Sequence, residues 1–299
     1  MRVSDRQRYH VTGTRVEHAK TQNSDVLEQV STQKRINHVS DDPVAFGQSL
    51  KRQTAINDMG QYQKNIEFSK GYIERAEASL MGIGDFLIRA KELSVSLSNS
   101  TYDVSSRKAA AREVKELIEG IVGLANAQYG GRYVFSGFRT KTPPLSRDGN
   151  FLGDDGAIFL QIDHGTFRQI NLQARNLFEP NVVEREQGRF GMIHALDVLQ
   201  DSLNKDDLDG IRKVMDELDH LIDKTSSYQA TLGAIYNGVE NTARRIELSK
   251  EVTVKELSNL EDVDTYKSAS EFKRTEGVLQ STMLASNKLL QPSLLNFLQ

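Results

Sequence analysis

The stretch Tyr228-Gln-Ala-Thr-Leu-Gly-Ala-Ile-Tyr-Asn-Gly-Val-Glu-Asn-Thr-Ala-Arg-Arg-Ile246 carries one narrow apolar stripe. Its members are Tyr228, Leu232, Ile235, Val239, Thr242 and Ile246, separated by steps of 4, 3, 4, 3 and 4 residues. This nearly seven-residue spacing is typical of a long helix that packs along a partner helix. The stretch therefore predicts a fold built on long, paired helices.

The same spacing continues upstream, at Leu208, Ile211, Met215, Leu218, Ile222 and Thr225. Asp206 and Asp207 precede this run and are suited to cap the start of a helix. We expect a single helix from about Asp207 to about Glu261, on the order of 80 Å long at about 1.5 Å per residue. Because most helical stability comes from packing, such a helix needs partners along its length.

The first half of the chain supplies candidate partner helices. One apolar stripe comprises Ile66, Ile73, Ala76, Leu80, Ile83, Leu87 and Ala90, and a second comprises Val114, Ile118, Ile121 and Ala125. Asp42 is predicted to cap the first of these helices, with Pro43 at its first position, and residues 98–103 are predicted to form a loop ending in a second cap. Helices within residues 42–128 and 192–262 should therefore bundle.

Residues 130–191 differ from both flanks, since they hold 9 of the 21 glycines and 3 of the 5 prolines. Short runs typical of strands occur at residues 133–135, 157–162 and 167–172, separated by turn clusters. They predict a β-rich insert that hangs from the end of the bundle. Its own small core would contain Ile158, Leu160, Ile162, Ile170 and Leu172. Its ends should lie close together, which would make residues 146–187 removable.

Composition excludes several classes of protein. The 38 Lys+Arg balance 41 Asp+Glu, which gives neither nucleic acid nor an anionic membrane a reason to bind the whole chain. No window approaches the roughly 18 consecutive apolar residues of a membrane span, and no cleavable signal opens the chain. Cysteine is absent, and the six histidines lack metal-ligand spacing. We therefore predict no catalytic residue, no cofactor, no metal and no enzyme.

The two ends carry the candidate partner-binding residues. The N-terminal stripe at Tyr9, Thr12, Val16, Ala19, Asn23, Val26 and Val30 has several polar or small members, so this helix would be marginal alone. Residues 277–299 contain one charge, Lys288, among many apolar residues. They would either pack on the chain's own bundle or form an assembly surface between subunits. The candidates are Tyr9, Val16, Val26, Val30, Leu279, Met283, Leu290, Leu294, Leu295 and Phe297.

Three segments resemble the bacterial flagellin family: Met1-Arg-Val-Ser4, Lys34-Arg-Ile-Asn-His-Val-Ser-Asp-Asp-Pro43, and Gly130-Gly-Arg-Tyr-Val-Phe-Ser-Gly-Phe138 followed by Thr140-Lys-Thr-Pro-Pro144. The motif residues are Ser40, Asp41, Asp42, Pro43, Gly131, Arg132, Tyr133, Phe135 and Gly137. The segment at 130–138 resembles the members at the junction of hook and filament, whereas residues 291–295 are nearer to flagellin itself. The resemblance covers roughly residues 1–145 and 228–299.

The resemblance implies a mainly α, elongated, layered rod with a β-rich insert. Residues 1–34 with 263–299 would form a terminal coiled-coil layer, residues 35–130 with 192–262 a helical bundle, and residues 131–191 the outer domain. It also implies a structural adapter that joins the hook region to the filament as a junction ring. The implied partners are copies of itself, a neighbouring hook-associated protein, flagellin and an export chaperone. Export would use the flagellar type III apparatus without signal cleavage, placing the protein outside the cell.

Two alternatives remain open at this stage. The chain could be a flagellin, that is, a filament subunit of the same assembly. It could also be an intracellular coiled-coil scaffold, which would account for the seven-residue spacing but not for the apolar C-terminal end or the insert.

Overall fold

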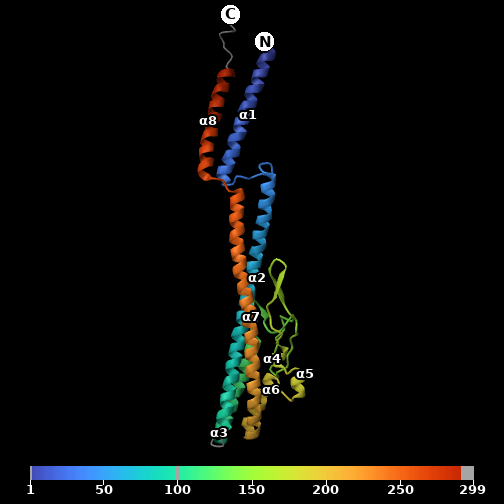
Figure 1. The fold of residues 1–299 in the computed structure, drawn as a ribbon. Helices are drawn as coiled ribbons and strands as arrows, with labels where there is room; N and C mark the ends of the chain where they lie inside the picture. Colours follow the sequence, from blue (N-terminus) through green and yellow to red (C-terminus); the bar gives the residue numbers. More distant parts are fainter. Residues whose placement is uncertain (1, 99–101, 291–299) are drawn as a thin grey trace. The chain divides into compact units, whose positions relative to one another are not determined.

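Long helices make up most of the protein, and a small β-containing insert interrupts them, as predicted. The computed structural model describes residues 2–98 and 102–290, with the side chains of residues 6–98 and 102–288. The long helices are α1 (Arg2–Thr32), α2 (Pro43–Leu97), α3 (Val104–Ala125), α6 (Met192–Lys205), α7 (Leu208–Glu261) and α8 (Thr265–Leu290) (Figure 1). The insert contains β1 (Gln128–Tyr129), β2 (Arg132–Tyr133), β3 (Phe159–Asp163), β4 (Thr166–Gln169), α4 (Arg175–Phe178) and α5 (Val182–Glu186).

The chain divides into two compact units, each of which is described by itself. The terminal unit comprises Met1–Asp58 with Leu248–Gln299, and the central unit comprises Met59–Glu247. Both α2 and α7 contribute one part to each unit.

Three aspartates fix the starts of the long helices by capping them. The Ala45 N–H donates to Asp42 Oδ1 over 2.9 Å at α2, and the Ser106 N–H donates to Asp103 Oδ1 over 2.9 Å at α3. At α7 the Gly210 N–H donates to Asp207 Oδ1 over 3.1 Å. These bonds satisfy amide groups that have no partner inside the helix. The caps predicted at Asp42, Asp103 and Asp207 and the single helix after Asp207 are confirmed, whereas Asp206 instead ends α6 at a φ of +60°.

The central unit has one continuous apolar core. Every residue of the two stripes predicted in α2 and α3 is buried within it. From α7 it takes Ile211, Val214, Leu218, Leu221, Leu232, Val239 and Ile246. From α6 it takes Met192, Ile193, Ala195, Leu196, Leu199 and Leu203. The seven-residue spacing thus marks the faces that pack together.

The insert belongs to this core, so the prediction of a separate small core is wrong. Ile162, Ile170 and Leu172 are buried in the same cluster as the helices. The insert lies along α2 and α7 within the central unit, not beyond the end of the helices (Figure 1). Removing residues 146–187 would therefore uncover part of the core, because the same apolar residues cover the helices.

Secondary structure in the insert is also sparser than predicted. Its strands form two antiparallel pairs, β1 with β2 and β3 with β4, and two short helices, α4 and α5, follow them. The β3–β4 hairpin turns at Gly165, whose φ of +64° suits glycine. The side chain of Asn65 on α2 donates to the Gln161 carbonyl over 2.8 Å, which anchors the hairpin on that helix.

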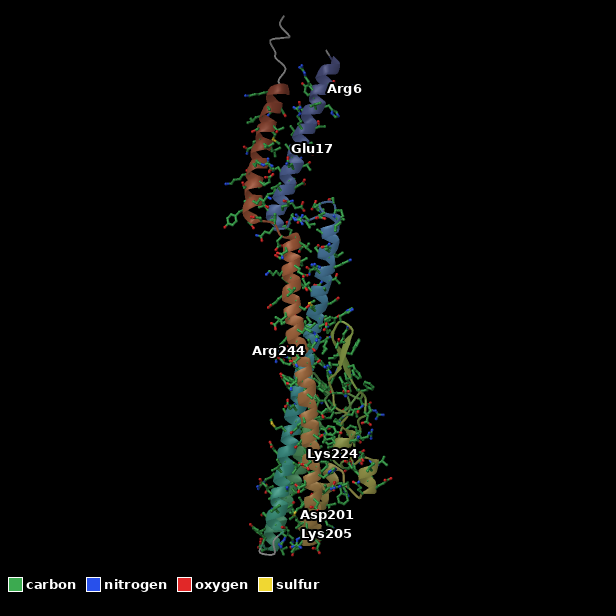
Figure 2. All side chains as sticks on the ribbon, in the orientation of Figure 1. Arg6, Glu17, Asp201, Lys205, Lys224 and Arg244 are labelled. Atoms are coloured by element: carbon green, nitrogen blue, oxygen red, sulfur yellow. The ribbon has the colours of Figure 1, made fainter. Side chains whose placement is uncertain are left out.

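Half-buried charges hold α5 against α7. Glu184 accepts from Lys224 Nζ at 2.8 and 3.0 Å, and His220 Nε2 lies 3.3 Å away. Glu184 also completes a capping box with Asn181. Burial alone would raise the pKa of Glu184, but the Lys224 ammonium and the Asn181 amide hold that pKa below its usual value. Figure 2 labels Lys224 where α7 passes the insert.

Truncating Phe178 tests how closely the insert and the helices share a core. Phe178 is 1% exposed, and its ring centroid lies 5.9 Å from that of Phe135. The variant Phe178→Ala should destabilise the central unit by about 3–5 kcal/mol in urea unfolding. The control Phe159→Ala, at a side chain that is 57% exposed, should change stability little. Equal effects of the two variants would contradict a shared core.

Glu184 should give the central unit an acid-sensitive contribution to stability. Because its folded pKa is lowered, the contribution is present above the unfolded value near 4.5 and is lost as the pH falls through the folded pKa. The variant Glu184→Gln should therefore flatten the dependence of unfolding free energy on pH below about 4.5. The control Glu186→Gln, on the exposed side of α5, should keep it. An unchanged pH profile in Glu184→Gln would contradict this role.

Candidate assembly surface

The two terminal helices, α1 and α8, lie side by side in the terminal unit (Figure 1). The Thr275 hydroxyl donates to Asn23 Oδ1 over 3.2 Å across the contact. Asp264 caps α8 by accepting from the N–H groups of Tyr266 and Lys267 at 3.0 and 3.1 Å. The predicted pairing of the terminal helices is thus present in the structure.

Small and polar residues line the seam between these helices. On α1 the seam follows the predicted stripe from Thr12 to Val30, all of whose members are buried or half-buried. On α8 it follows Ser268, Phe272, Thr275, Leu279, Thr282 and Ser286, also buried or half-buried. Steps of 4, 3, 4, 3 and 4 residues separate these α8 positions. Apolar spacing does not predict this second stripe, because only two of its six members are apolar.

Large apolar side chains of both helices lie outside the seam. They are Tyr9 at 53% exposure, Val11 at 41%, Leu27 at 47%, Val278 at 47%, Met283 at 44% and Leu284 at 65%. An open groove beside the seam is lined by Thr12, Arg15, Arg274, Gly277, Val278, Ser281, Thr282, Ala285 and Ser286. The pair therefore leaves a good part of its apolar surface uncovered.

The predicted partner-binding residues divide into three groups. Val16, Val26, Val30 and Leu279 are half-buried in the seam, so they join the chain's own helices. Tyr9 and Met283 are exposed. The side chain of Leu290, and Leu294, Leu295 and Phe297 altogether, lie outside the described residues. Within the described part, the apolar C-terminal residues thus divide between the seam, which takes Leu279, and the exposed surface, which takes Met283.

The connector after α1 is tied to the connector after α7. The Arg35 N–H donates to the Glu261 carbonyl over 2.6 Å, and the Val263 N–H donates to the Gln33 carbonyl over 3.1 Å. Lys34 Nζ pairs with Glu261 at 3.0 Å, and Arg35 Nη2 donates to the Leu260 carbonyl over 2.9 Å. The basic start of the Lys34–Pro43 motif thus joins two distant parts of the chain.

The acidic end of this motif shapes a turn and a cap. Asp41 Oδ2 accepts from the N–H groups of His38 and Asn37 at 2.8 and 3.0 Å, and these bonds lower the pKa of Asp41. Asp42 caps α2, Pro43 is the first residue of that helix, and Ser40 is exposed. These motif residues therefore have structural roles within the terminal unit.

The Gly130–Phe138 motif anchors the start of the insert in the central unit. Gly131 turns the β1–β2 hairpin at a φ of +75°, with Arg132 exposed and Tyr133 half-buried beside it. Phe135 is fully buried. The Tyr72 hydroxyl donates to the Val134 carbonyl over 2.8 Å, and burial raises the pKa of Tyr72 to about 12.

Gly137 ends the motif in a position that only glycine fits. Its φ is +66°, and a Cβ there would lie 2.1 Å from Asp154 Oδ1. That oxygen accepts from the N–H groups of Phe138 and Gly156 at 2.7 and 2.9 Å. Burial would raise the pKa of Asp154, but these two amides hold it below its usual value. The motif therefore fixes the direction of the loop that follows it.

The described residues contain no group of three His, Cys, Asp or Glu side chains suited to a metal ion. None of the described helices is both long and apolar enough to cross a membrane.

Two family models match the chain. The bacterial flagellin N-terminal helical region matches residues 3–140, and the bacterial flagellin C-terminal helical region matches residues 215–298. Among curated relatives, flagellar hook-associated protein 3 of Escherichia coli strain K12 is 26% identical, covering 86% of this chain and 87% of the relative. The protein of that name from Salmonella typhimurium is 23% identical, with coverages of 94% and 95%. Flagellin of Bacillus subtilis is 26% identical, with coverages of 86% and 85%.

Solved structures share the fold. A flagellar hook-associated protein from Vibrio parahaemolyticus matches with a TM-score of 0.68 at 19% identity, covering 74% of this chain and 100% of that chain. FlgL from Bacillus cereus matches with a TM-score of 0.60 at 21% identity, with coverages of 69% and 98%. Since the two family models together span most of the sequence, this chain belongs to the bacterial flagellin family, whose members are structural proteins of the flagellum and not enzymes.

Proposed function

We propose that this protein is a structural adapter that joins the flagellar hook region to the flagellin filament by forming a junction ring. The observation that carries the proposal is the terminal helix pair, whose large apolar side chains lie outside its own seam. Exposed apolar surface of this kind marks sites of protein association. Relatives named flagellar hook-associated protein 3 that cover 86% and 94% of this chain also support the proposal.

The proposed assembly has three layers. Residues 1–34 with 263–299 form the terminal coiled-coil layer, residues 35–130 with 192–262 the helical bundle, and residues 131–191 the outer domain. Copies of the chain meet through the terminal layer, where Tyr9, Met283 and Leu284 stay exposed in the single chain. A hook-associated protein adjoins the ring on one side and flagellin on the other.

Before assembly, an export chaperone covers the apolar C-terminal helix. Covering this surface prevents premature association inside the cell. The flagellar type III apparatus then exports the chain without cleaving a signal, so that the protein acts outside the cell. Neither nucleic acid nor membrane insertion takes part in the proposed function.

A filament subunit is the second candidate. The 26% identity with Bacillus subtilis flagellin equals the identity with the Escherichia coli hook-associated protein. The junction role is favoured by the Gly130–Phe138 segment, which resembles the corresponding segment of junction members. This segment is held at the start of the insert by the close packing of Gly137 on Asp154 and by the hydrogen bond from the Phe138 N–H to Asp154. The two candidates predict different contents of the culture medium.

Deleting the gene should leave hooks that carry no filaments, with flagellin subunits released into the medium. The physical reason is that exported flagellin lacks the ring on which it polymerises. Electron microscopy of the cells and protein analysis of the medium measure the two outcomes. If the chain were the filament subunit, filaments would be absent without another filament protein accumulating outside the cell. Normal filaments on the deletion strain would refute both roles.

Placing a charge on the outward face of α8 should abolish assembly without unfolding the helix pair. Leu284 is 65% exposed, so Leu284→Asp should leave the circular dichroism of the purified protein unchanged. The charge would be desolvated in a packed interface, so the variant should not restore filaments in the deletion strain. The control Asn241→Asp adds the same charge at an exposed position of α7, away from the terminal helix pair, and should restore them. Restored filaments in Leu284→Asp would remove this face from the assembly surface.

A further inference from the structure

An exposed stripe on α2 combines acidic and apolar residues in alternation. Its members are Glu77, Met81, Asp85, Ile88, Glu92 and Val95, and we call them the acidic stripe. Steps of 4, 4, 3, 4 and 3 residues place all six on one face of the helix. Met81, Ile88 and Val95 are 59%, 46% and 47% exposed.

Within the single chain, Glu92 is the one member of this stripe that forms an ion pair with a described residue, and that pair is with Arg89 of the same helix. Adjacent faces of α2 make the contacts: Gly82 meets Leu124 of α3, and Gly84 meets Gln229 of α7. The nearby cations of α2 form other ion pairs. Lys91 pairs with Asp219 of α7, and Arg89 pairs with Glu113 of α3 and with Glu92 of the stripe. Among the described residues, no ion pair involves Glu77 or Asp85. Apolar residues at seven-residue spacing with acidic neighbours therefore face outward without a partner in this chain.

A second surface of the central unit has the opposite charge. Residues 131–147 contain four basic residues and no acidic residue. The four, Arg132, Arg139, Lys141 and Arg147, are exposed, and none forms an ion pair with a described residue. Phe138 is 67% exposed among them. We call Arg132, Phe138, Arg139, Lys141 and Arg147 the basic loop.

Local contacts restrain the part of the basic loop around Phe138 and Arg139. Phe138 follows Gly137, its N–H is bound by Asp154 Oδ1, and its ring covers Gly156 so closely that a Cβ there would lie 2.3 Å from it. Arg139 Nη1 donates to the Leu152 carbonyl over 3.3 Å. A restrained loop that exposes an aromatic ring among cations loses little entropy on binding, so it suits a protein contact.

We infer that the basic loop of one copy docks on the acidic stripe of α2 in a second copy. The charges are complementary, each surface adds apolar side chains, and no described ion pair joins the two within one chain. The inference rests on the proposed self-assembly and names its side-by-side contact. Because the two surfaces differ, each copy would bind one neighbour through its basic loop and a second neighbour through its acidic stripe. Such head-to-tail association forms a ring if the rotation between copies closes.

Cross-linking between two kinds of copy tests the contact, and the absence of cysteine gives a clean background. Ser96→Cys lies next to the stripe, and Thr142→Cys lies next to the loop, both at exposed positions that leave the charges intact. With a short bis-maleimide, purified full-length copies should yield dimers in the mixture and not from either variant alone. Copies carrying both cysteines should yield a ladder of larger species. A mixture with Asn176→Cys in place of Thr142→Cys is the control and should yield none.

Charge reversal tests the chemistry of the same contact. Arg139→Glu with Lys141→Glu on the loop copy should abolish the cross-link, and Glu77→Lys with Asp85→Lys on the stripe copy should restore it. Lys108→Glu with Lys115→Glu, at exposed positions of α3, is the matched control and should leave the cross-link unchanged. Added salt should weaken the contact, because exposed charges are screened.

The inference is overturned if the mixture cross-links no better than the control, or if the reversed pairs fail to restore a lost cross-link. Dimers from Ser96→Cys alone would overturn it too, because they would indicate a symmetric contact of the stripe with itself. A missing cross-link together with filament loss in the deletion strain would refute only this contact and would leave the proposed junction role standing. A specific cross-link together with normal filaments in that strain would support the contact and remove the junction role.

Discussion

Burial of one face of α7 along its central-unit part is the constraint on which the rest of that unit depends. A helix of 54 residues with charged and polar residues on most of its surface cannot rely on helix propensity, so it needs a packed face along its length. In the central unit Leu218, Leu232 and Val239 supply that face and are fully buried. The insert adds to the same packed face, since Ile162, Ile170 and Leu172 are buried in one cluster with the helices.

Helix positions were predictable because their signals are local. Seven-residue spacing marked the buried faces of α2, α3 and α7, and the aspartate before each helix marked its start. The placement of the insert was not predictable, since strand-like runs such as Phe159–Asp163 show that a segment is apolar without showing what it covers. The short helix α5 escaped notice because its stability comes from Glu184, Lys224 and Asn181, which are distant in sequence or specific to one turn.

The candidate surface was half predictable for a similar reason. The α1 stripe was found because valines mark it, and it does line the seam. The α8 side of the seam was not predicted because apolar content drew attention to Met283 and its neighbours, whereas small residues such as Ser268 and Thr275 are the buried ones. Hydrophobicity predicts which residues favour burial, but the close approach of two helices depends on side-chain size. The large residues left outside the seam, such as Tyr9 and Met283, stay exposed in the single chain.

The tie between the two connectors has a mechanical consequence. Backbone hydrogen bonds join Arg35 to Glu261 and Val263 to Gln33, and the Lys34–Glu261 ion pair reinforces them. A force applied to α1 would thus be shared with the end of α7 before it reaches α2. A force applied to α8 would be shared with residues 33–35, which follow α1. Neither terminal helix bears a load alone. In a structure that rotates and bends, such load sharing would keep the two helices in register while the flagellum turns.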